Sequence, residues 1–331
     1  MSKLPQPDGE LLGEELTPQR AAGASRDSGF PGVGDGRFAP SPTGPLHLGN
    51  LRTALLAWLF ARSAGARFLV RMEDLDFGRV RPGVEEQQLA DLSAIGLDWD
   101  GPVVRQSERT HLYEGAIAQL DAGGFLYPCY CSRKEIREAA SAPHGKPAEG
   151  VYPGTCRELT WTERRDREHS GRPPALRLNA GGAIRVGFED RLLGPRSAVV
   201  DDFVVRRGDG VPAYNLAVIV DDAAQGIGEV VRGADLVDTT PRQILLARLL
   251  AIQQPGYAHV PLMLGPDGTR LAKRHGAVTL DERTALGDSP ATVLAELARG
   301  LGMAAQNEQL TTATLLERFE PSTPLPGGLE A

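Results

Sequence analysis

Three prolines within six residues constrain the fold of this chain more than any other feature. Pro40, Pro42 and Pro45 follow the short apolar segment Phe38-Ala39. Proline has no backbone N–H and a fixed φ, so this stretch can form neither the interior of a helix nor a central strand. Beyond it, apolar side chains recur at helical spacing, at Leu51, Ala54, Leu55, Trp58 and Leu59. The prolines therefore predict a rigid turn between a buried strand and a helix.

The segments after this helix alternate between strand and helix patterns. We expect a strand over residues 67–72 and a helix over roughly residues 83–95. Strand, helix, strand, helix is the alternation of an α/β fold with a parallel sheet. In such sheets ligands bind beyond the carboxyl ends of the strands. The proline-rich turn and Glu73, which follows the second strand, both fall at that edge.

The second half of the chain returns to this pattern. We expect strands over residues 203–206 and 213–220, because they flank Gly208-Asp209-Gly210, a strong hairpin signal. Thr240-Pro241 predicts the start of a helix, with threonine as the N-cap and proline at the first helical position. Weaker helical patterns follow near residues 290–301 and 311–319.

Residues 127–200 interrupt the alternation, since they carry all three cysteines, many arginines and glutamates, and loops punctuated by proline. We interpret them as an insertion into the α/β domain. The chain is then expected to divide into a disordered tail (1–35), the first half of the α/β domain (36–126), the insertion (127–200), the second half (201–255), a loop around Lys273 with a short helical region (256–320) and a loose tail (321–331).

Composition limits the class of protein. At 331 residues the chain has room for about two domains. Its 41% apolar and 24% charged residues are typical of a soluble globular protein. A net charge of −7 means that any nucleic-acid site must be a local basic feature. Three cysteines argue against a secreted disulfide framework, and the sequence has neither a membrane-spanning run nor a signal peptide, so we expect the cytoplasm and no membrane partner.

The helix after the proline-rich turn offers a site for phosphate. A helix N-terminus presents unpaired N–H groups and partial positive charge. His47 and Asn50 lie three residues apart and share a face, where both side chains could donate to phosphate oxygens. Gly49 would let a base or a ribose approach the backbone closely. The alternative is a proline-rich turn with an incidental histidine.

Charged residues near the same edge suit an amino-acid ligand. An α-ammonium group needs a carboxylate, and a side-chain carboxylate needs a guanidinium. Glu73 can serve the ammonium, and Arg37 and Arg232 are candidates for the carboxylates. The alternative for Glu73 is a surface ion pair with Arg71.

Two further groups of residues indicate ligand binding. Gly268 to Arg274 places three cations after a glycine, which would make a mobile clamp for a triphosphate; the alternative is a solvated basic loop. Cys129, Cys131 and Cys156 indicate zinc, which takes four ligands in a tetrahedron. On chemistry alone His144 or His169 would be the fourth ligand, and three unligated buried thiols are the alternative.

The string from Arg37 to Asn50 resembles the signature of the class I aminoacyl-tRNA synthetases in its glutamyl form. His47-Leu48-Gly49-Asn50 matches the His-Ile-Gly-His element of that family, with Asn50 in place of the second histidine. Ser41 stands where glutaminyl enzymes have glutamate. Gly268 to Arg274 resembles the family's Lys-Met-Ser-Lys-Ser loop, and Lys273 aligns with its second lysine.

This resemblance implies a Rossmann-like catalytic domain that uses ATP with Mg²⁺. His47, Asn50 and Lys273 would be catalytic, and together with Gly49 they would bind ATP. The glutamate site would be lined by Arg37, Phe38, Ala39, Pro40, Ser41, Glu73, Tyr214 and Arg232. For Tyr214, an ordinary place in the core of a sheet is the alternative.

The cysteines are similar in order to those of the short glutamyl-queuosine tRNA-Asp synthetases, which place two cysteines, a tyrosine and a cysteine along the chain. The resemblance implies one structural zinc ion held by Cys129, Cys131, Tyr152 and Cys156, in a subdomain inserted between the halves of the catalytic domain. A short helical part would complete the chain.

The length of the chain also bears on which tRNA can accept the glutamyl group. Only 57 residues follow Arg274, too few for a separate anticodon-binding region of about 100–200 residues. The short, zinc-containing synthetases that the chain resembles act on the anticodon loop itself, so the resemblance implies transfer of glutamate to queuosine at the wobble position of tRNA-Asp. We also expect a monomer. Two alternatives stay open: a truncated glutamyl-tRNA synthetase that charges the 3′ end of tRNA-Glu, and a non-catalytic zinc-containing tRNA-binding module.

Overall fold

The proline-rich turn lies between a strand and a helix, as predicted. The structure, a computed structural model, describes residues 34–132, 134–136, 152–169, 171–265, 267–269, 271, 276, 278–323 and 325–326. Strand β1 (Gly36–Phe38) precedes the turn, α1 (Leu48–Ser63) follows it, and β2 (Phe68–Met72) pairs in parallel with β1. Backbone N–H groups of Glu73 and Arg81 donate to the carbonyls of Pro40 and Pro42, at 2.9 and 3.1 Å. These bonds hold the turn against the loop that follows β2.

The central sheet is mostly parallel, which confirms the predicted α/β fold. Backbone hydrogen bonds join its strands into two groups. A parallel bridge between Asp35 and Ile227 connects the groups next to β1 and β9 (Glu229–Gly233). Every pair is parallel except the hairpin of β6 (Ile184–Asp190) and β7 (Gly194–Val200). The resulting strand order is β3 (Val104–Arg105), β2, β1, β9, β10 (Gly256–Val260), β6 and β7.

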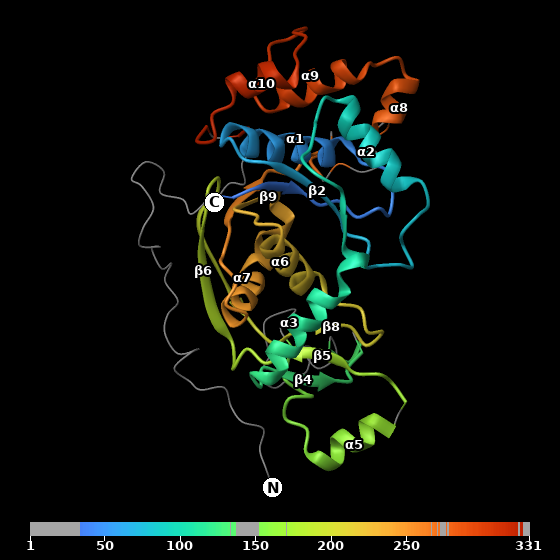
Figure 1. Ribbon diagram of the computed structural model, residues 1–331, viewed down its shortest axis with the longest axis vertical. Helices are drawn as coiled ribbons and strands as arrows, with labels where there is room; N and C mark the ends of the chain where they lie inside the picture. Colours follow the sequence, from blue (N-terminus) through green and yellow to red (C-terminus); the bar gives the residue numbers. More distant parts are fainter. Residues whose placement is uncertain are drawn as a thin grey trace.

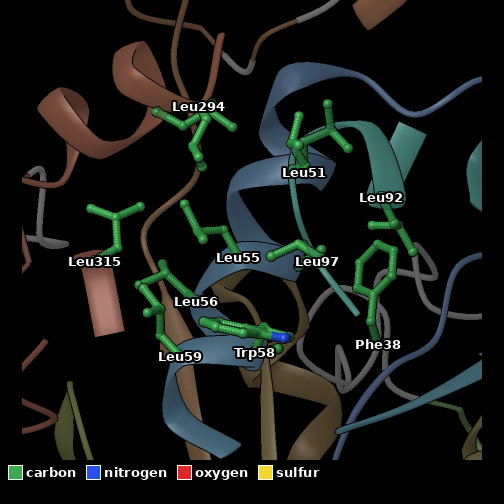
Figure 2. Close-up of a cluster of buried hydrophobic side chains, with 14 of the residues drawn as sticks. Phe38, Leu51, Leu55, Leu56, Trp58, Leu59, Leu92, Leu97, Leu294 and Leu315 are labelled. Carbon is green, nitrogen blue, oxygen red and sulfur yellow. The ribbon is translucent and has the colours of Figure 1, made fainter. Parts of the chain in front are cut away.

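The helix α1 forms the centre of one hydrophobic core. The sequence predicted a single apolar face, but α1 is buried on nearly all sides. Figure 2 shows why: its leucines point both toward Leu92 of α2 (Val84–Ala94) and toward Leu294 and Leu315 of the C-terminal helices. Because those helices cover its second face, α1 carries more apolar side chains than a surface helix needs.

The C-terminal helices lie at one end of the molecule (Figure 1). The predicted helices are confirmed as α9 (Pro290–Gly300) and α10 (Thr312–Arg318). A further short helix, α8 (Leu280–Ala285), was not predicted, although Thr279 and Glu282 form a capping box at its start.

A small antiparallel sheet lies at the opposite end (Figure 1). Its strands are β4 (Leu126–Cys129), β5 (Ala175–Leu178) and β8 (Phe203–Arg206), with β5 in the middle. The exposed helix α5 (Trp161–His169) extends from it, and α3 (Thr110–Ala122) leads into it. The β6–β7 hairpin, which the sequence assigned to the insertion, instead joins the central sheet at β10. The domain boundaries themselves stay a prediction.

The prediction of a strand over residues 213–220 is wrong. These residues begin the helix α6 (Tyr214–Ala224), because an apolar run such as Leu216–Val220 fits a buried helix as well as a buried strand. The turn at Gly208-Asp209-Gly210 reverses the chain as predicted. A bridge between Arg206 and Pro212 and a few backbone hydrogen bonds pair its two sides, and α6 begins before a second strand can form.

The start of α7 (Thr240–Leu249) is displaced by one residue from its prediction. Thr239 occupies the N-cap position, and Thr240 is the first helical residue. The Thr240 hydroxyl lies instead among buried polar groups of the central sheet. No helix within the described residues is long and apolar enough to span a membrane.

Candidate active site

A cavity of about 400 Å³ lies at the carboxyl ends of β1 and β9. From β1 the chain continues through α1 to β2 on one side, and from β9 it continues through α7 to β10 on the other. Such a reversal of direction opens a crevice between two adjacent strands, and α/β proteins bind ligands there. The cavity is lined by residues that the sequence singled out, namely Arg37, Phe38, Ala39, Pro40, Ser41, His47, Gly49, Asn50, Glu73, Tyr214 and Arg232.

His47 is the N-cap of α1. Its Nδ1 accepts from the backbone N–H of Asn50, and its own N–H donates to Asn50 Oδ1, both at 3.1 Å. Since Nδ1 accepts, the ring proton of a neutral His47 is on Nε2. A Cβ on Gly49 would meet the imidazole at 3.0 Å, so a larger residue here would push His47 from its capping position. The prediction that both side chains can donate at the helix N-terminus fits this geometry through His47 Nε2 and Asn50 Nδ2.

Arg37 is buried and is held by a carboxylate from α6. Its Nε and Nη2 donate to the two oxygens of Asp222 at 3.1 and 3.3 Å, and Nη1 donates to the carbonyl of Val231 at 3.4 Å. Burial alone would raise the pKa of Asp222, but Arg37 and Arg71 lower it below its ordinary value. The pair therefore stays charged and fixes Arg37 at the floor of the cavity.

The fully buried Arg71 was not predicted to have a role beyond an ion pair with Glu73. Its Nη1 donates to Asp222 Oδ1 and Gln225 Oε1, both at 2.8 Å, and its Nε lies 3.7 Å from Asp221 Oδ2. Only its Nη2 faces Glu73 Oε1, at 3.4 Å. One guanidinium is thus shared by several acceptors, and its contact with Glu73 is longer than those with Asp222 and Gln225.

Glu73 is therefore left as a mostly buried carboxylate, with 11% of its side chain exposed, and without a strong partner of its own. Burial raises its pKa, and the positive charges of Arg71 and Arg37 oppose that rise. A mostly buried carboxylate of this kind favours a cationic ligand. An ammonium group would supply the positive charge that Arg71 divides among several acceptors. The predicted alternative, the ion pair with Arg71, is present but does not satisfy the group.

Several lining residues were missed by the sequence analysis. Asp235 lies three residues after Arg232 in the segment that leaves β9. Leu262 and Met263 come directly after β10, whose carboxyl end lies at the same edge. The signal that could have found them is their position just beyond a strand of a parallel sheet.

Lys273, the predicted ATP-binding lysine, lies outside the described residues, as do Arg270, Ala272 and Arg274. The described residues on either side of it contact the site. Met263 lines the cavity and accepts from the N–H of Leu271 at 2.9 Å. Thr279 forms a bridge with His47. Described residues that precede and follow Lys273 in the chain therefore lie next to the cavity.

A second cavity of about 860 Å³ adjoins the first. Ser41, Glu73 and Tyr214 line both cavities. The second extends from them toward the small antiparallel sheet, along the turn at Gly208-Asp209-Gly210. Its wall mixes charged and apolar side chains, among them Asp76, Gln106, Arg172, Pro173, Arg207 and Asp209.

The three cysteines come together at the end of the molecule that holds the small sheet. Their Sγ atoms all lie within 4.8 Å of one another. Tyr152 Oη lies 3.5 Å from Cys129 Sγ and 3.7 Å from Cys131 Sγ. A tetrahedral zinc ion with Zn–S bonds of about 2.3 Å separates its sulfur ligands by about 3.8 Å. The three thiols and the phenol therefore fit the donor set of one zinc ion.

The histidines considered as a fourth ligand are placed differently. Among the described residues, the only group of histidine, cysteine or carboxylate side chains close enough to share a metal is Cys129, Cys131 and Cys156. His169 is exposed on α5, where its Nδ1 lies 2.6 Å from the carbonyl of Arg165. His144 lies outside the described residues.

Comparisons with known proteins agree with this geometry. The family model "tRNA synthetases class I (E and Q), catalytic domain" matches residues 35–324. A glutamyl-Q tRNA(Asp) synthetase from Nocardia farcinica is 59% identical over 291 residues, which cover 87% of this chain and 90% of the relative. One from Symbiobacterium thermophilum is 54% identical, covering 86% and 92%.

Among solved structures, a glutamate tRNA ligase from Elizabethkingia meningosepticum in complex with its amino acid is similar, with a TM-score of 0.76 and 29% identity. The match covers 88% of this chain and 66% of that one. The chain thus spans about two thirds of the length of that structure.

The Asp222 ion pairs predict a measurable effect on stability. We expect Asp222→Asn to lower the free energy of unfolding near neutral pH by about 3 kcal/mol, since Arg37 then lacks its charged partner. Because the folded-state pKa of Asp222 lies below 3.8, its contribution is complete above that value and is lost as pH falls through the lowered pKa. Urea denaturation followed by circular dichroism, from about pH 7 down to about pH 3, measures both effects.

The matched control is Asp209→Asn, whose half-exposed carboxylate pairs with Arg207. We expect this control to change the free energy of unfolding by less than about 0.5 kcal/mol. The difference between wild type and Asp222→Asn should shrink only at the acid end of the series. A variant as stable as wild type near neutral pH would show that the carboxylate does not hold the arginines.

Proposed function

The chain belongs to the glutamyl-Q tRNA(Asp) synthetase family of class I tRNA synthetases, and we propose that it activates L-glutamate with ATP and transfers the glutamyl group to queuosine at the wobble position of tRNA-Asp. The observation that carries the proposal is the cavity in which Arg37, Glu73 and Arg232 meet the N-terminus of α1. That set of groups suits an amino acid with two carboxylates next to a nucleotide. The relatives' names supply the acceptor.

Glutamate would bind through its three charges. Glu73 would bind the α-ammonium, and Arg37 and Arg232 would bind the carboxylates. Tyr214, the first residue of α6, stands where the two cavities meet and would contact the bound amino acid. All of these groups are fixed by hydrogen bonds or secondary structure before a ligand arrives, so little ordering remains to oppose binding.

ATP would bind with its phosphates at the N-terminus of α1. A glutamate carboxylate oxygen attacks the α-phosphate of ATP–Mg²⁺, the bond to the β-phosphate oxygen breaks, and pyrophosphate leaves. His47 and Asn50 would donate to the phosphate oxygens, and Lys273 would stabilise the negative charge on the departing pyrophosphate. No protein nucleophile is needed, because positioning and charge stabilisation suffice.

The second cavity would receive the acceptor nucleoside. It begins at Ser41, Glu73 and Tyr214, beside the place where the glutamyl-adenylate would lie. A hydroxyl of the queuosine cyclopentenediol would attack the glutamyl carbonyl and release AMP. Carboxylates and guanidinium groups in the wall could bind hydroxyl and ring N–H groups as well as phosphate. A local site of this kind agrees with a net charge of −7.

We also propose one structural zinc ion held by Cys129, Cys131, Tyr152 and Cys156. It would take no part in the reaction and would lock the loops beside the small sheet. Free thiols suit a reducing compartment, and we propose that the enzyme acts in the cytoplasm.

The acceptor is tested by transfer of radiolabelled glutamate. We expect incorporation into tRNA-Asp that carries queuosine and none into the same tRNA prepared without queuosine, since only the former has the diol. Glutamylation of tRNA-Glu at its 3′ end would instead support a truncated glutamyl-tRNA synthetase. A protein that lacks glutamate-dependent pyrophosphate exchange would not be an enzyme of this class.

The two halves of the site should respond separately to substitution. We expect Arg232→Ala to raise the KM for glutamate by about tenfold to a hundredfold, with a much smaller effect on the KM for ATP. Lys273→Ala should lower the rate of exchange by about a hundredfold while the melting temperature stays near that of wild type. Arg185→Ala, on an exposed strand position, is the control and should change neither. Equal effects of Arg232→Ala on both KM values would contradict its assignment to glutamate.

Zinc binding is tested by metal content after purification. We expect Cys156→Ser to lose most of the zinc and Tyr152→Phe to bind it more weakly, because each removes one ligand. Tyr130→Phe is the matched control, since this buried tyrosine donates to Glu168 at 3.0 Å. Full zinc occupancy in Cys156→Ser would rule out the proposed ligand set.

A further inference from the structure

A row of buried polar side chains crosses three neighbouring strands next to the glutamate pocket. Asp190 is the last residue of β6, His259 lies in β10, and Arg232 lies in β9. His259 and Arg232 are direct partners in the parallel register of β9 and β10. His259 is completely inaccessible to solvent, and its neighbours are nearly so. The established motifs of the sequence include neither Asp190 nor His259.

The hydrogen bonds in this row run in one direction. Asp190 Oδ2 lies 2.5 Å from His259 Nδ1, and the carboxylate also accepts from the backbone N–H groups of Leu192 and Leu193. On the other side of the ring, His259 Nε2 lies 3.0 Å from Arg232 Nε. A guanidinium can only donate, so Nε2 must be the acceptor. His259 is therefore the neutral tautomer that carries its proton on Nδ1 and donates it to Asp190.

The charges around the ring favour this neutral form. Burial lowers the pKa of His259, and the guanidinium groups of Arg232 and Arg37 lower it further, against the opposing effect of Asp190. The pKa of Asp190 is itself below its ordinary value, because its hydrogen bonds outweigh the cost of burial. The row thus holds one negative carboxylate, one neutral imidazole and one positive guanidinium.

Two of the three guanidinium nitrogens of Arg232 donate hydrogen bonds within this arrangement. Nε donates to His259, and Nη2 donates to the hydroxyl of Thr240 at 2.7 Å. Among the described residues, the buried Nη1 has no hydrogen-bond partner, although Arg232 lines the first cavity. A buried guanidinium nitrogen without an acceptor is costly, and a ligand carboxylate would satisfy it.

We propose that His259, held by Asp190, is a positioning residue. It orients Arg232 so that Nη1, the nitrogen without a partner among the described residues, is available to the carboxylate of the bound amino acid. The inference rests on the proposed function, because glutamate is the ligand that Arg232 would bind. Without the acceptor on His259, Arg232 could rotate to satisfy its own Nε, and Nη1 would no longer be held where the carboxylate of the proposed ligand can reach it. We therefore expect the row formed by Asp190, His259 and Arg232 to affect the binding of glutamate and to leave the binding of ATP unchanged.

Two substitutions at one position separate the contacts of the imidazole. In His259→Gln, the side-chain amide oxygen reaches the place of Nε2 and can still accept from Arg232. In His259→Asn, the shorter amide reaches only the place of Nδ1, so it can donate to Asp190 but leaves Arg232 Nε without an acceptor. Val260→Ala, whose side chain is in the core on the opposite face of β10, controls for loss of stability.

Glutamate-dependent pyrophosphate exchange gives the KM for each substrate. We expect His259→Asn to raise the KM for glutamate by about tenfold, the effect of one hydrogen bond to a charged group, and His259→Gln to raise it by less than about threefold. The KM for ATP should stay within about twofold of wild type in both. Val260→Ala should lower the melting temperature without changing either KM.

Equal KM values for glutamate in the two histidine variants, or parallel changes for glutamate and ATP, would overturn the proposal. Crystal structures of the variants provide a readout that needs no activity: Arg232 should keep its orientation in His259→Gln and rotate in His259→Asn. An unchanged Arg232 in both structures would also overturn it. If wild type shows no exchange at all, the proposed function fails, and these structures still decide the role of His259.

Discussion

The pairing of Asp222 with Arg37 and Arg71 is the interaction on which the site depends. It joins one side chain from α6 to one from β1 and one from β2. The neighbouring Asp221 continues the network, since it accepts from Gln106, Arg109 and Tyr113. Burying a guanidinium group without a carboxylate partner is costly, so these aspartates fix where α6 lies against the sheet. The position of Tyr214, at the start of that helix, follows from them.

The two halves of the site are built by different physical means. On the side proposed for the nucleotide, the proline-rich turn and the cap of α1 rely on local hydrogen bonds and on residues close together in the sequence. On the side proposed for the amino acid, Arg37 and Arg232 are held by a carboxylate and an imidazole from distant elements. A loss of tertiary packing would therefore disturb Arg37 and Arg232 before it disturbed the local turn before α1.

This difference also decides how much the sequence could predict. The helix after the prolines, the parallel sheet and the cavity residues from Arg37 to Asn50 follow from local patterns, and the structure places them together. Asp222 and His259 could not be found this way, because they act on residues 185 and 27 positions away along the chain. The run Leu216–Val220 was assigned to a strand, because local apolarity does not distinguish a buried strand from a buried helix. Lys273 lies outside the described residues, so its role rests on the motif alone.

Hydrogen bonds connect the cysteine cluster to the wall of the second cavity. The backbone N–H of Tyr152 donates to Asp201, and the other oxygen of that carboxylate accepts from Arg242 of α7. Directly after Asp201 the chain forms β8 and then the turn at Gly208-Asp209-Gly210, which lines the second cavity. The proposed zinc ion, by tightening the loops around Tyr152, would thus stabilise the wall of the second cavity from a distance. Under the proposed function, its loss would affect transfer to RNA although the ion would contact neither the amino acid nor ATP.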